Sequence, residues 1–259
     1  MQQDSKNPPQ GDEQEVPARR LFLKQAAGIA GAMPIGLQFG VAGGGAILAG
    51  PALAQATGGA SAPEVAAGYA SLSADEAAFV EALVNLMCPA DSYTPNGVDA
   101  GLAVYIDRQL AGAFGKGAKR YMRGPWLRGK PQHGYQLPLI PEQFFKAGVE
   151  AAEQACTAKF GKGFEQITAA QAEAFLRDLA EGKVAHDQID LAAWFNDLVY
   201  PLFNQACFAD PIYGGNAGKV FWKMIGYPGL PATHTINMIQ YRGKPFPGAN
   251  DPKSITDFS

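Results

Sequence analysis

The sequence predicts a mainly α-helical fold: a single helical domain with a long irregular arm and an irregular C-terminal tail, preceded by a cleavable signal segment. Three observations support this prediction. Apolar residues recur at helical spacing behind capping residues, no stretch alternates with period two, and no charged residue lies between Lys24 and Glu64. The predicted organisation is a signal segment over 1–54, a linker over 55–72 and a helical domain over 73–259.

The N-terminal segment has the layout of a twin-arginine export signal, in which an arginine pair precedes a mildly apolar stretch. The residues that carry this pattern lie in "ARRLFLK": Arg19, Arg20, Phe22, Leu23 and Lys24. Small residues in "ALA" at 52–54 favour cleavage before Gln55. The alternative is a membrane-anchor helix. Eight glycines between Gln25 and Ala54 disfavour it, because each costs about 1 kcal/mol of helix stability relative to Ala.

Two helices are expected before the arm. Ser73 and Glu76 form the S-x-x-E pattern of a capping box, and Pro89 ends the helix that follows. A short helix over 100–112 comes next. Six glycines and four prolines then fall between Gly112 and Pro141, which is too many for a simple linker and predicts an ordered irregular arm.

Three further helices are expected after the arm. Pro141 begins "PEQFFKAGVEAAEQACTAKFG", and Thr168 caps "AAQAEAFLRDLAEGK". A strongly apolar helix over 189–210 contains Pro201, which predicts a kink. Beyond residue 226, Gly and Pro recur at short intervals and so predict an irregular tail.

Charge and cysteine content narrow the possible functions. Residues 55–259 contain 17 Lys and Arg against 20 Asp and Glu, a balance that argues against nucleic acid as a partner. Cys88, Cys156 and Cys207 are far apart. An odd number of thiols in an oxidising compartment leaves one unpaired or bonded to another chain. We expect Cys156 in the core and Cys207 near a partner.

No known catalytic or cofactor motif is present. The stretch "DPIYGGNAGKVFWKMIGYPG" at 210–229 is not a phosphate loop, because Gly214 lies only four residues before Gly218 and Val220 follows Lys219. There is no C-x-x-C-H for haem, no cysteine grouping for an iron–sulfur cluster and no G-x-S-x-G elbow. We therefore expect no cofactor, no metal and no catalytic residue in this chain.

Two stretches without acidic residues, 108–141 and 211–250, combine basic and aromatic side chains on glycine-rich backbone. This composition is typical of a protein interface, where rings supply buried area and Arg supplies directed hydrogen bonds. A solvated basic surface is the alternative. The predicted interface residues are Arg120, Arg123, Trp126, Cys207, Tyr213, Gly214, Gly215, Asn216, Phe221, Trp222 and Tyr227.

The twin-arginine pattern, the "PEQFF" helix, "FADPIYGGN" and "GKVFWKMIGYPG" together resemble the small subunit of membrane-bound gluconate 2-dehydrogenase, the subunit 3 family, over residues 73–230. The resemblance implies a subunit without a redox centre. Its implied partners are a large flavoprotein of the glucose–methanol–choline type, a multihaem cytochrome c subunit and the Tat translocase. FAD, with an iron–sulfur cluster as a further candidate, would belong to the large subunit, and haem c to the cytochrome.

The function expected from this resemblance is that of a non-catalytic, chaperone-like small subunit of a periplasmic dehydrogenase for gluconate or a related sugar or polyol. It would serve twin-arginine export and assembly of the large FAD subunit, and would lie peripheral to the inner membrane through the complex. Two alternatives remain open. One is a stand-alone periplasmic enzyme, and the other is a periplasmic binding module for a small sugar acid.

Overall fold

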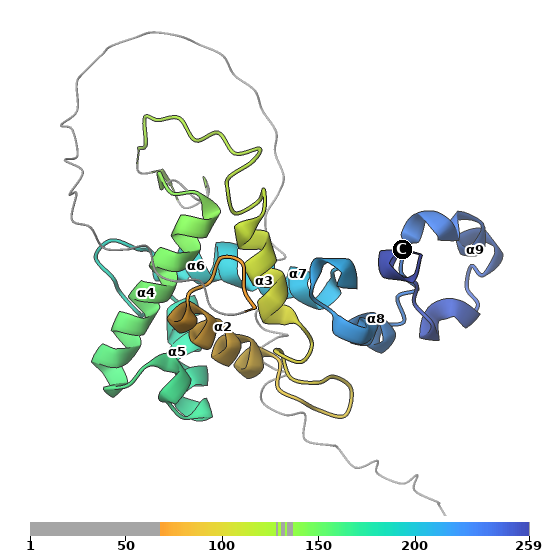
Figure 1. The fold of residues 1–259 in the computed structure, drawn as a ribbon, viewed down its shortest axis with the longest axis horizontal. Helices are drawn as coiled ribbons and strands as arrows, with labels where there is room; N and C mark the ends of the chain where they lie inside the picture. The colour runs from red at the N-terminus through yellow and green to blue at the C-terminus, as the bar shows by residue number, and fades with distance from the viewer. Residues whose placement is uncertain (1–67, 128, 131–132, 134–136, 259) are drawn as a thin grey trace, which may run out of the picture. The chain divides into compact units, whose positions relative to one another are not determined.

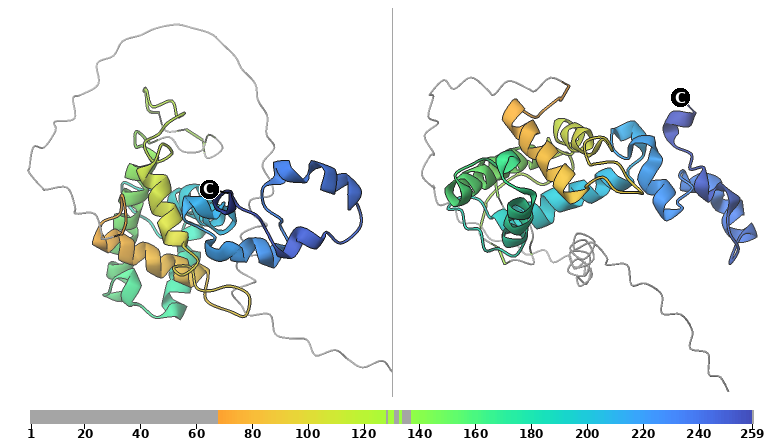
Figure 2. Two further views of the ribbon diagram at one scale, coloured as in Figure 1. Left: turned by 45° about the vertical axis from the view of Figure 1, so that its right-hand side comes forward. Right: turned by 90° about the horizontal axis from the view of Figure 1, so that it is seen from below.

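The computed structural model describes residues 68–258, except 128, 131–132 and 134–136 (Figure 1). The chain divides into two units, 1–60 and 61–259, and every described residue belongs to the second. Over this part the fold is mainly helical and contains no strand, as two further views show (Figure 2). The predicted fold class is confirmed to that extent, whereas the predicted signal segment lies outside the described residues.

The body of the described unit is built from helices that agree closely with those predicted. In chain order they are α2 (Ala74–Met87), α3 (Leu102–Ala111), α4 (Pro141–Phe160), η2 (Phe164–Gln166), α5 (Ala169–Ala180), α6 (Leu191–Trp194), η3 (Phe195–Val199) and α7 (Tyr200–Phe208). The predicted arm between α3 and α4 has no regular helix among its described residues. No described helix combines the length and the apolarity that crossing a membrane requires.

Local chemistry sets the starts of the helices. The Ser73 hydroxyl accepts from the Glu76 N–H at 3.4 Å, and the Glu76 carboxylate accepts from the Ser73 N–H at 2.8 Å. Thr168 and Gln171 form the same reciprocal pair at the start of α5. Both pairs satisfy N–H groups that the first turn of a helix leaves free. Pro141 occupies the first position of α4, where its missing N–H costs nothing.

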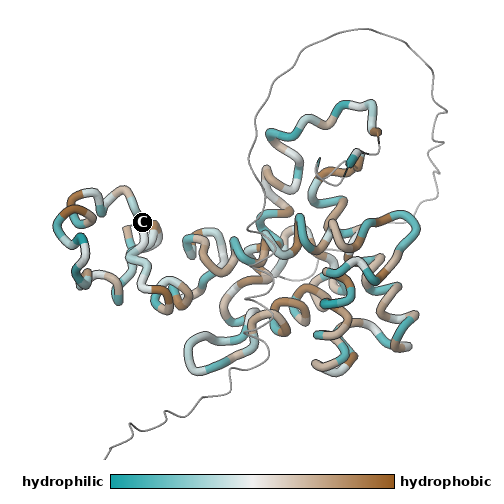
Figure 3. Tube along the Cα trace, turned by 180° about the vertical axis from the view of Figure 1, so that it is seen from behind, coloured by the Kyte–Doolittle hydropathy of each residue, from teal (hydrophilic) through white to brown (hydrophobic). Residues whose placement is uncertain are grey.

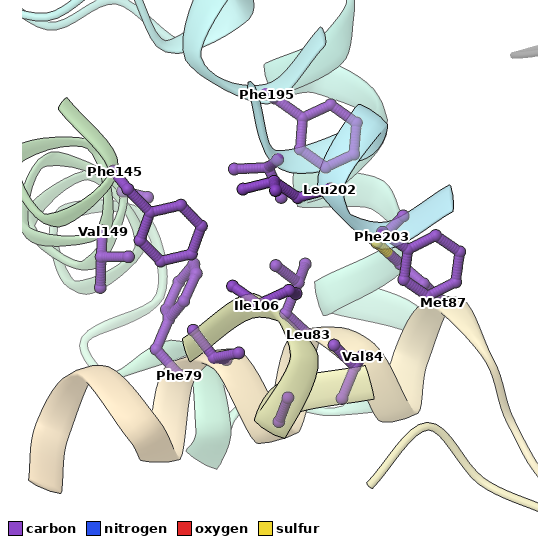
Figure 4. Packing of buried hydrophobic residues seen from close by; sticks show 14 of the residues in the cluster. Phe79, Leu83, Val84, Met87, Ile106, Phe145, Val149, Phe195, Leu202 and Phe203 are labelled. Carbon is purple, nitrogen blue, oxygen red and sulfur yellow. The ribbon is translucent and has the colours of Figure 1, made fainter. Parts of the chain in front are cut away.

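The core lies between α2, α3, α4 and α7, whose apolar side chains converge in Figure 4. Trp194 is completely buried, with its ring 6.2 Å from those of Phe79 and Phe145. Its indole N–H donates to the Phe145 carbonyl at 3.1 Å. A Cβ at Gly148 would lie 2.1 Å from the indole, so the glycine of α4 makes room for this ring.

The predicted kink at Pro201 takes the form of a widened turn. The segment η3 is a π-helix that ends immediately before α7, in which Pro201 is the second residue. Proline lacks the N–H for the i→i−4 bond and its ring crowds that carbonyl, and a π-turn relieves both problems. Backbone angles at Trp194 and Tyr200 stay right-handed helical, so 191–208 is one continuous irregular helix.

A buried carboxylate fixes the point where the chain enters the helical body. Asp107 on α3 is 2% exposed and accepts from the N–H groups of residues 70–72 at 2.7, 2.8 and 3.0 Å. The Ser71 hydroxyl donates to Glu142, and the Lys146 ammonium donates to the Ser71 carbonyl at 2.6 Å. We call this set of contacts the entry clamp. It ties the start of the body to α3 and α4.

After α7 the chain forms η4 (Pro211–Tyr213), η5 (Ala217–Lys219) and α8 (Val220–Ile225). The tail beyond residue 226, expected to be irregular, contains short helical turns, because its Pro and Gly residues interrupt each helix after one or two turns. These are η6 (Pro231–His234), α9 (Thr235–Gln240), η7 (Pro247–Asn250) and η8 (Ile255–Asp257). We call residues 226–258 the C-terminal extension. No residue from 230 to 250 is buried.

Candidate functional site

The glycine-rich loop between α7 and α8 is a left-handed turn pressed against the body. Gly214, Asn216, Gly218 and Lys219 have φ angles of 102°, 49°, 64° and 60°. At Gly215 a Cβ would lie 2.4 Å from a backbone oxygen of α7. Glycine is therefore needed for conformation at 214 and for close approach at 215. The loop holds no phosphate pattern and acts as a spacer between two helices.

The buried side chain of Asn216 holds this loop in place by hydrogen bonds. Its side chain is fully buried, accepts from the Phe221 N–H at 3.0 Å and donates to the Ala209 carbonyl at 3.1 Å. Asn tolerates the left-handed conformation better than most residues. One side chain thus joins the end of α7 to the start of α8.

The aromatic residues after the loop pack within the chain itself. Phe221 and Trp222 are 5% and 4% exposed, and the Trp222 indole N–H donates to the Phe208 carbonyl at 2.8 Å. The rings of Trp222 and Tyr227 meet edge to face at 5.2 Å. Of the predicted interface residues, Phe221 and Asn216 are thus engaged in internal packing, and Trp222 is largely buried. Tyr213 remains exposed and Tyr227 half-buried.

Beside Trp222 lies an apolar groove of about 500 Å³, which we call the C-terminal groove. Its lining comes from α7, α8 and the C-terminal extension: Phe208, Asp210, Trp222, Ile225, Tyr227, Leu230, Pro231 and Ile255. Phe208, Ile225 and Ile255 are 45%, 56% and 42% exposed. Large apolar side chains of this exposure around one groove are typical of a binding surface.

The last residues of the chain fold back to form one wall of the groove. The Asp210 carboxylate accepts from the N–H of Ile212 at 3.1 Å and from that of Ile255 at 2.9 Å. Lys219 forms an ion pair with Asp257, and this hydrogen bond lowers the pKa of the Asp257 carboxyl to about 2. We call these contacts the tail latch.

A smaller groove of about 220 Å³ lies within the extension, beside α9. The rings of His234 and Tyr241 meet the Phe246 ring edge to face at 5.3 and 5.2 Å. His234 Nδ1 is 3.0 Å from the Asn237 amide, while its Nε2 is buried without a hydrogen-bond partner among the described residues. Burying a polar atom without a hydrogen-bond partner lowers stability, so the hydrogen bonding of His234 in the extension is incomplete within the described residues.

The thiols do not form a reactive site. Cys88, Cys156 and Cys207 are all free and buried. Burial raises the pKa of Cys156 to about 11 and raises that of Cys207 further. Since the thiolate is the species that exchanges with a disulfide, such thiols are inert. Cys156 lies in the core as expected, and the burial of Cys207 removes it from the surface that we propose for a partner.

The interface residues predicted in the arm are exposed to solvent, and the arm contacts the start of α4. Arg120, Arg123 and Trp126 are exposed, and the Arg120 guanidinium lies 5.9 Å from the centre of the Phe114 ring. The Glu142 N–H donates to the Gly115 carbonyl at 3.1 Å and ties the arm to α4. These residues and the C-terminal groove thus belong to different elements. The export-signal residues Arg19, Arg20, Phe22, Leu23 and Lys24 lie outside the described part.

A further cavity of about 700 Å³, beside α2 and α4, is lined largely by charged side chains. Its carboxylates serve local structure: Glu76 completes a helix cap and pairs with Lys146 at 3.2 Å, and Glu153 accepts from the Phe164 N–H at 3.2 Å. Burial raises the pKa of the Glu153 carboxyl. Within the described ranges, no group of three His, Cys, Asp or Glu side chains could hold a metal ion.

Comparison with protein families matches residues 74–229 to the description "Gluconate 2-dehydrogenase subunit 3". The chain belongs to the gluconate 2-dehydrogenase subunit 3 family. The match covers more than half of the chain, and it confirms the resemblance recognised from the sequence motifs. A subunit 3 implies other subunits in a gluconate 2-dehydrogenase complex. No curated protein and no solved structure matched the chain significantly.

The match to the subunit 3 family ends at Gly229, and the C-terminal groove takes residues from both sides of that boundary. Phe208, Trp222 and Ile225 come from the matched part, whereas Ile255 comes from beyond it. Sequence reasoning missed Phe208, Ile225 and Ile255 as candidate site residues. An Asp–Pro cap at Asp210 was a local signal for a turn, but nothing in the local sequence joins Asp210 to Ile255, 45 positions away.

Proposed function

We propose that this chain is the non-catalytic small subunit of a periplasmic, flavin-dependent dehydrogenase for gluconate or a related sugar or polyol. In this proposal it binds the large FAD subunit through the face that contains the C-terminal groove. It also carries that subunit through the twin-arginine route, and a multihaem cytochrome c accepts the electrons. The chain itself binds no cofactor.

One observation carries the binding part of the proposal: large apolar side chains are exposed mainly after residue 207. Figure 3 shows hydrophobic residues along the C-terminal extension as well as along the helices of the body. The exposed residues concerned are Phe208, Ile212, Tyr213, Met224, Ile225, Ile236, Met238, Ile239, Ile255 and Phe258.

The body buries its own core, and the extension does not. Helix α9 has only six residues, whereas an isolated helix below about 12 residues is marginal in water. Exposed apolar surface on this scale marks an interaction site on a soluble protein. A partner that covers the extension would supply the burial that the chain lacks.

The export part rests on the sequence of the N-terminal segment. Arg19 and Arg20 precede an uncharged Ala- and Gly-rich stretch, the pattern that twin-arginine signals share. Because this route carries folded cargo, a large subunit loaded with FAD in the cytoplasm could cross with the small subunit bound to it.

Co-expression tests the proposal. The tagged full chain is expressed alone and with the large flavoprotein subunit of the same complex, and both preparations are assayed for dye-linked gluconate oxidation. We expect the two subunits to co-purify and only the complex to oxidise substrate. Oxidation by the chain alone would instead identify an enzyme. Heat of gluconate binding to the isolated chain would identify a sugar-acid binding module.

A further inference from the structure

We propose that the C-terminal groove binds a segment of the large subunit that carries both apolar side chains and carboxylates. The tail latch holds the side of the groove that this segment contacts. The inference rests on the proposed function, since it takes the large subunit as the partner. It goes further by naming the anchoring residues and the chemistry of the segment that they receive.

The shape and lining of the groove favour apolar side chains. Trp222 and Ile225 are three residues apart on α8 and so face the same side of that helix. The Trp222 N–H is already bonded to the Phe208 carbonyl, so the floor of the groove offers no unpaired donor from this indole. The volume of about 500 Å³ lies within the range of about 300 to 1,000 Å³ that binding clefts span.

The charges of α8 and the C-terminal extension favour a partner with carboxylates. The acids of this region are already engaged: Asp210 holds Ile255, Asp251 pairs with Lys253 at 2.7 Å, and Asp257 pairs with Lys219. Three exposed cations of the same region have no ion pair within the described part of the chain: Lys223, Arg242 and Lys244. Complementary charge on the docked segment would steer association and select the partner.

Residues of the tail determine which partner the groove recognises. Ile255 stands in the wall because Asp210 and Lys219, both within the family match, hold the last residues in place. The wall itself comes from residues beyond residue 229, where the match ends. A groove with one wall from the matched region and one from the extension would recognise the large subunit of its own complex.

A membrane surface is the other partner that apolar and basic residues could suggest. The exposed residues Ile236, Met238 and Ile239 of α9 fall within an arc of about 160° on a helix that turns about 100° per residue, so their placement on α9 does not disfavour lipid. The C-terminal groove does, because a concave cleft of about 500 Å³ receives inserted side chains, whereas an interfacial helix lies on the lipid with one apolar face.

Affinity measurements with the full chain and the purified large subunit test the inference. Ile225→Asp and, independently, Ile255→Asp each place a charge in the groove, and we expect each to weaken binding by about 30-fold or more. Tyr93→Asp is the matched control, since Tyr93 is 63% exposed, lies on the body between α2 and α3, and lines neither groove. It should change affinity by no more than about twofold. Thermal melting checks that every variant is folded.

Charge reversal gives a second readout. Lys223→Glu should slow association and reduce its dependence on salt, whereas Lys162→Glu, an exposed lysine on the body, should do neither. If the unmodified chain does not bind the large subunit, the proposed function fails. If it binds and both groove variants bind equally well, or if Tyr93→Asp weakens binding more than they do, the docking inference is overturned while the proposed function stands. Loss of binding to anionic vesicles in Ile225→Asp, with large-subunit binding intact, would also overturn it.

Discussion

Replacing Asn216 tests whether the left-handed loop holds α8 in place. In Asn216→Ala, the Ala209 carbonyl and the Phe221 N–H lose their partners in a buried setting, at about 1.5 kcal/mol each. Alanine at a φ of 49° adds about 1 kcal/mol. The free energy of unfolding should therefore fall by about 4 kcal/mol, which corresponds to a fall in Tm of about 8 to 16 °C for a domain of this size.

Two further variants separate the causes. Asn216→Gly removes the same hydrogen bonds but accepts the left-handed conformation, so it should lose about 1 kcal/mol less than Asn216→Ala. Asn196→Ala is the control: Asn196 is exposed on the irregular helix and donates one bond, to the Ala180 carbonyl at 2.9 Å. It should cost about 1 kcal/mol or less.

Urea unfolding of the full chain, followed by circular dichroism, measures all three. The reasoning is refuted if Asn216→Ala unfolds within about 1 kcal/mol of the unmodified chain, because the two buried hydrogen bonds alone should cost more. If the Gly and Ala variants are equally stable, backbone strain contributes nothing at this position, and only the hydrogen-bond part of the argument survives.

Three other predictions concern separate parts of the chain. Asp107→Ala removes the acceptor of the entry clamp and should lower the free energy of unfolding by about 3 to 5 kcal/mol. A loss below about 1 kcal/mol in urea unfolding would show that water replaces the carboxylate. Because burial raises the pKa of Cys156 to about 11, only about one thiol in a thousand is ionised at pH 8. Maleimide should therefore label Cys156 far more slowly in the native chain than in urea, with labelling that rises with pH, and equal rates would contradict its burial. Replacing Arg19 and Arg20 by Lys keeps the charge but loses the planar guanidinium fork. It should leave both subunits folded and dye-active in the cytoplasm, and periplasmic flavoprotein in cell fractions would refute the export role.

Helix starts were predictable because the chemistry that sets them spans only three residues. Ser73 with Glu76 and Thr168 with Gln171 form their caps from neighbours in the sequence, and Pro141 begins α4 for the same local reason. The buried face of α4 also followed from periodicity, since Phe145 and Cys156 are both fully buried.

The candidate site was predicted only in outline, because distant parts of the chain decide which aromatic residues are covered. Trp222 was expected at a partner interface. Its indole N–H donates to the Phe208 carbonyl, 14 positions upstream, and this contact holds the ring largely within the chain. A helix of six residues such as α8 is too short to show a periodicity from which to choose a face. Ile225 and Ile255 line the same groove only because the tail latch holds the last residues of the chain beside α8.

The entry clamp imposes an order on the folding of a growing chain. Residues 70–72 emerge from the ribosome first, but their acceptor is Asp107, at least 35 positions later. The Lys146 ammonium that binds the Ser71 carbonyl follows 75 positions after it. A nascent chain that stops short of α4 cannot form these bonds, so the junction stays incomplete. A translation pause before codon 107 and one far enough beyond codon 146 for Lys146 to have left the ribosome should therefore give intermediates of very different protease sensitivity.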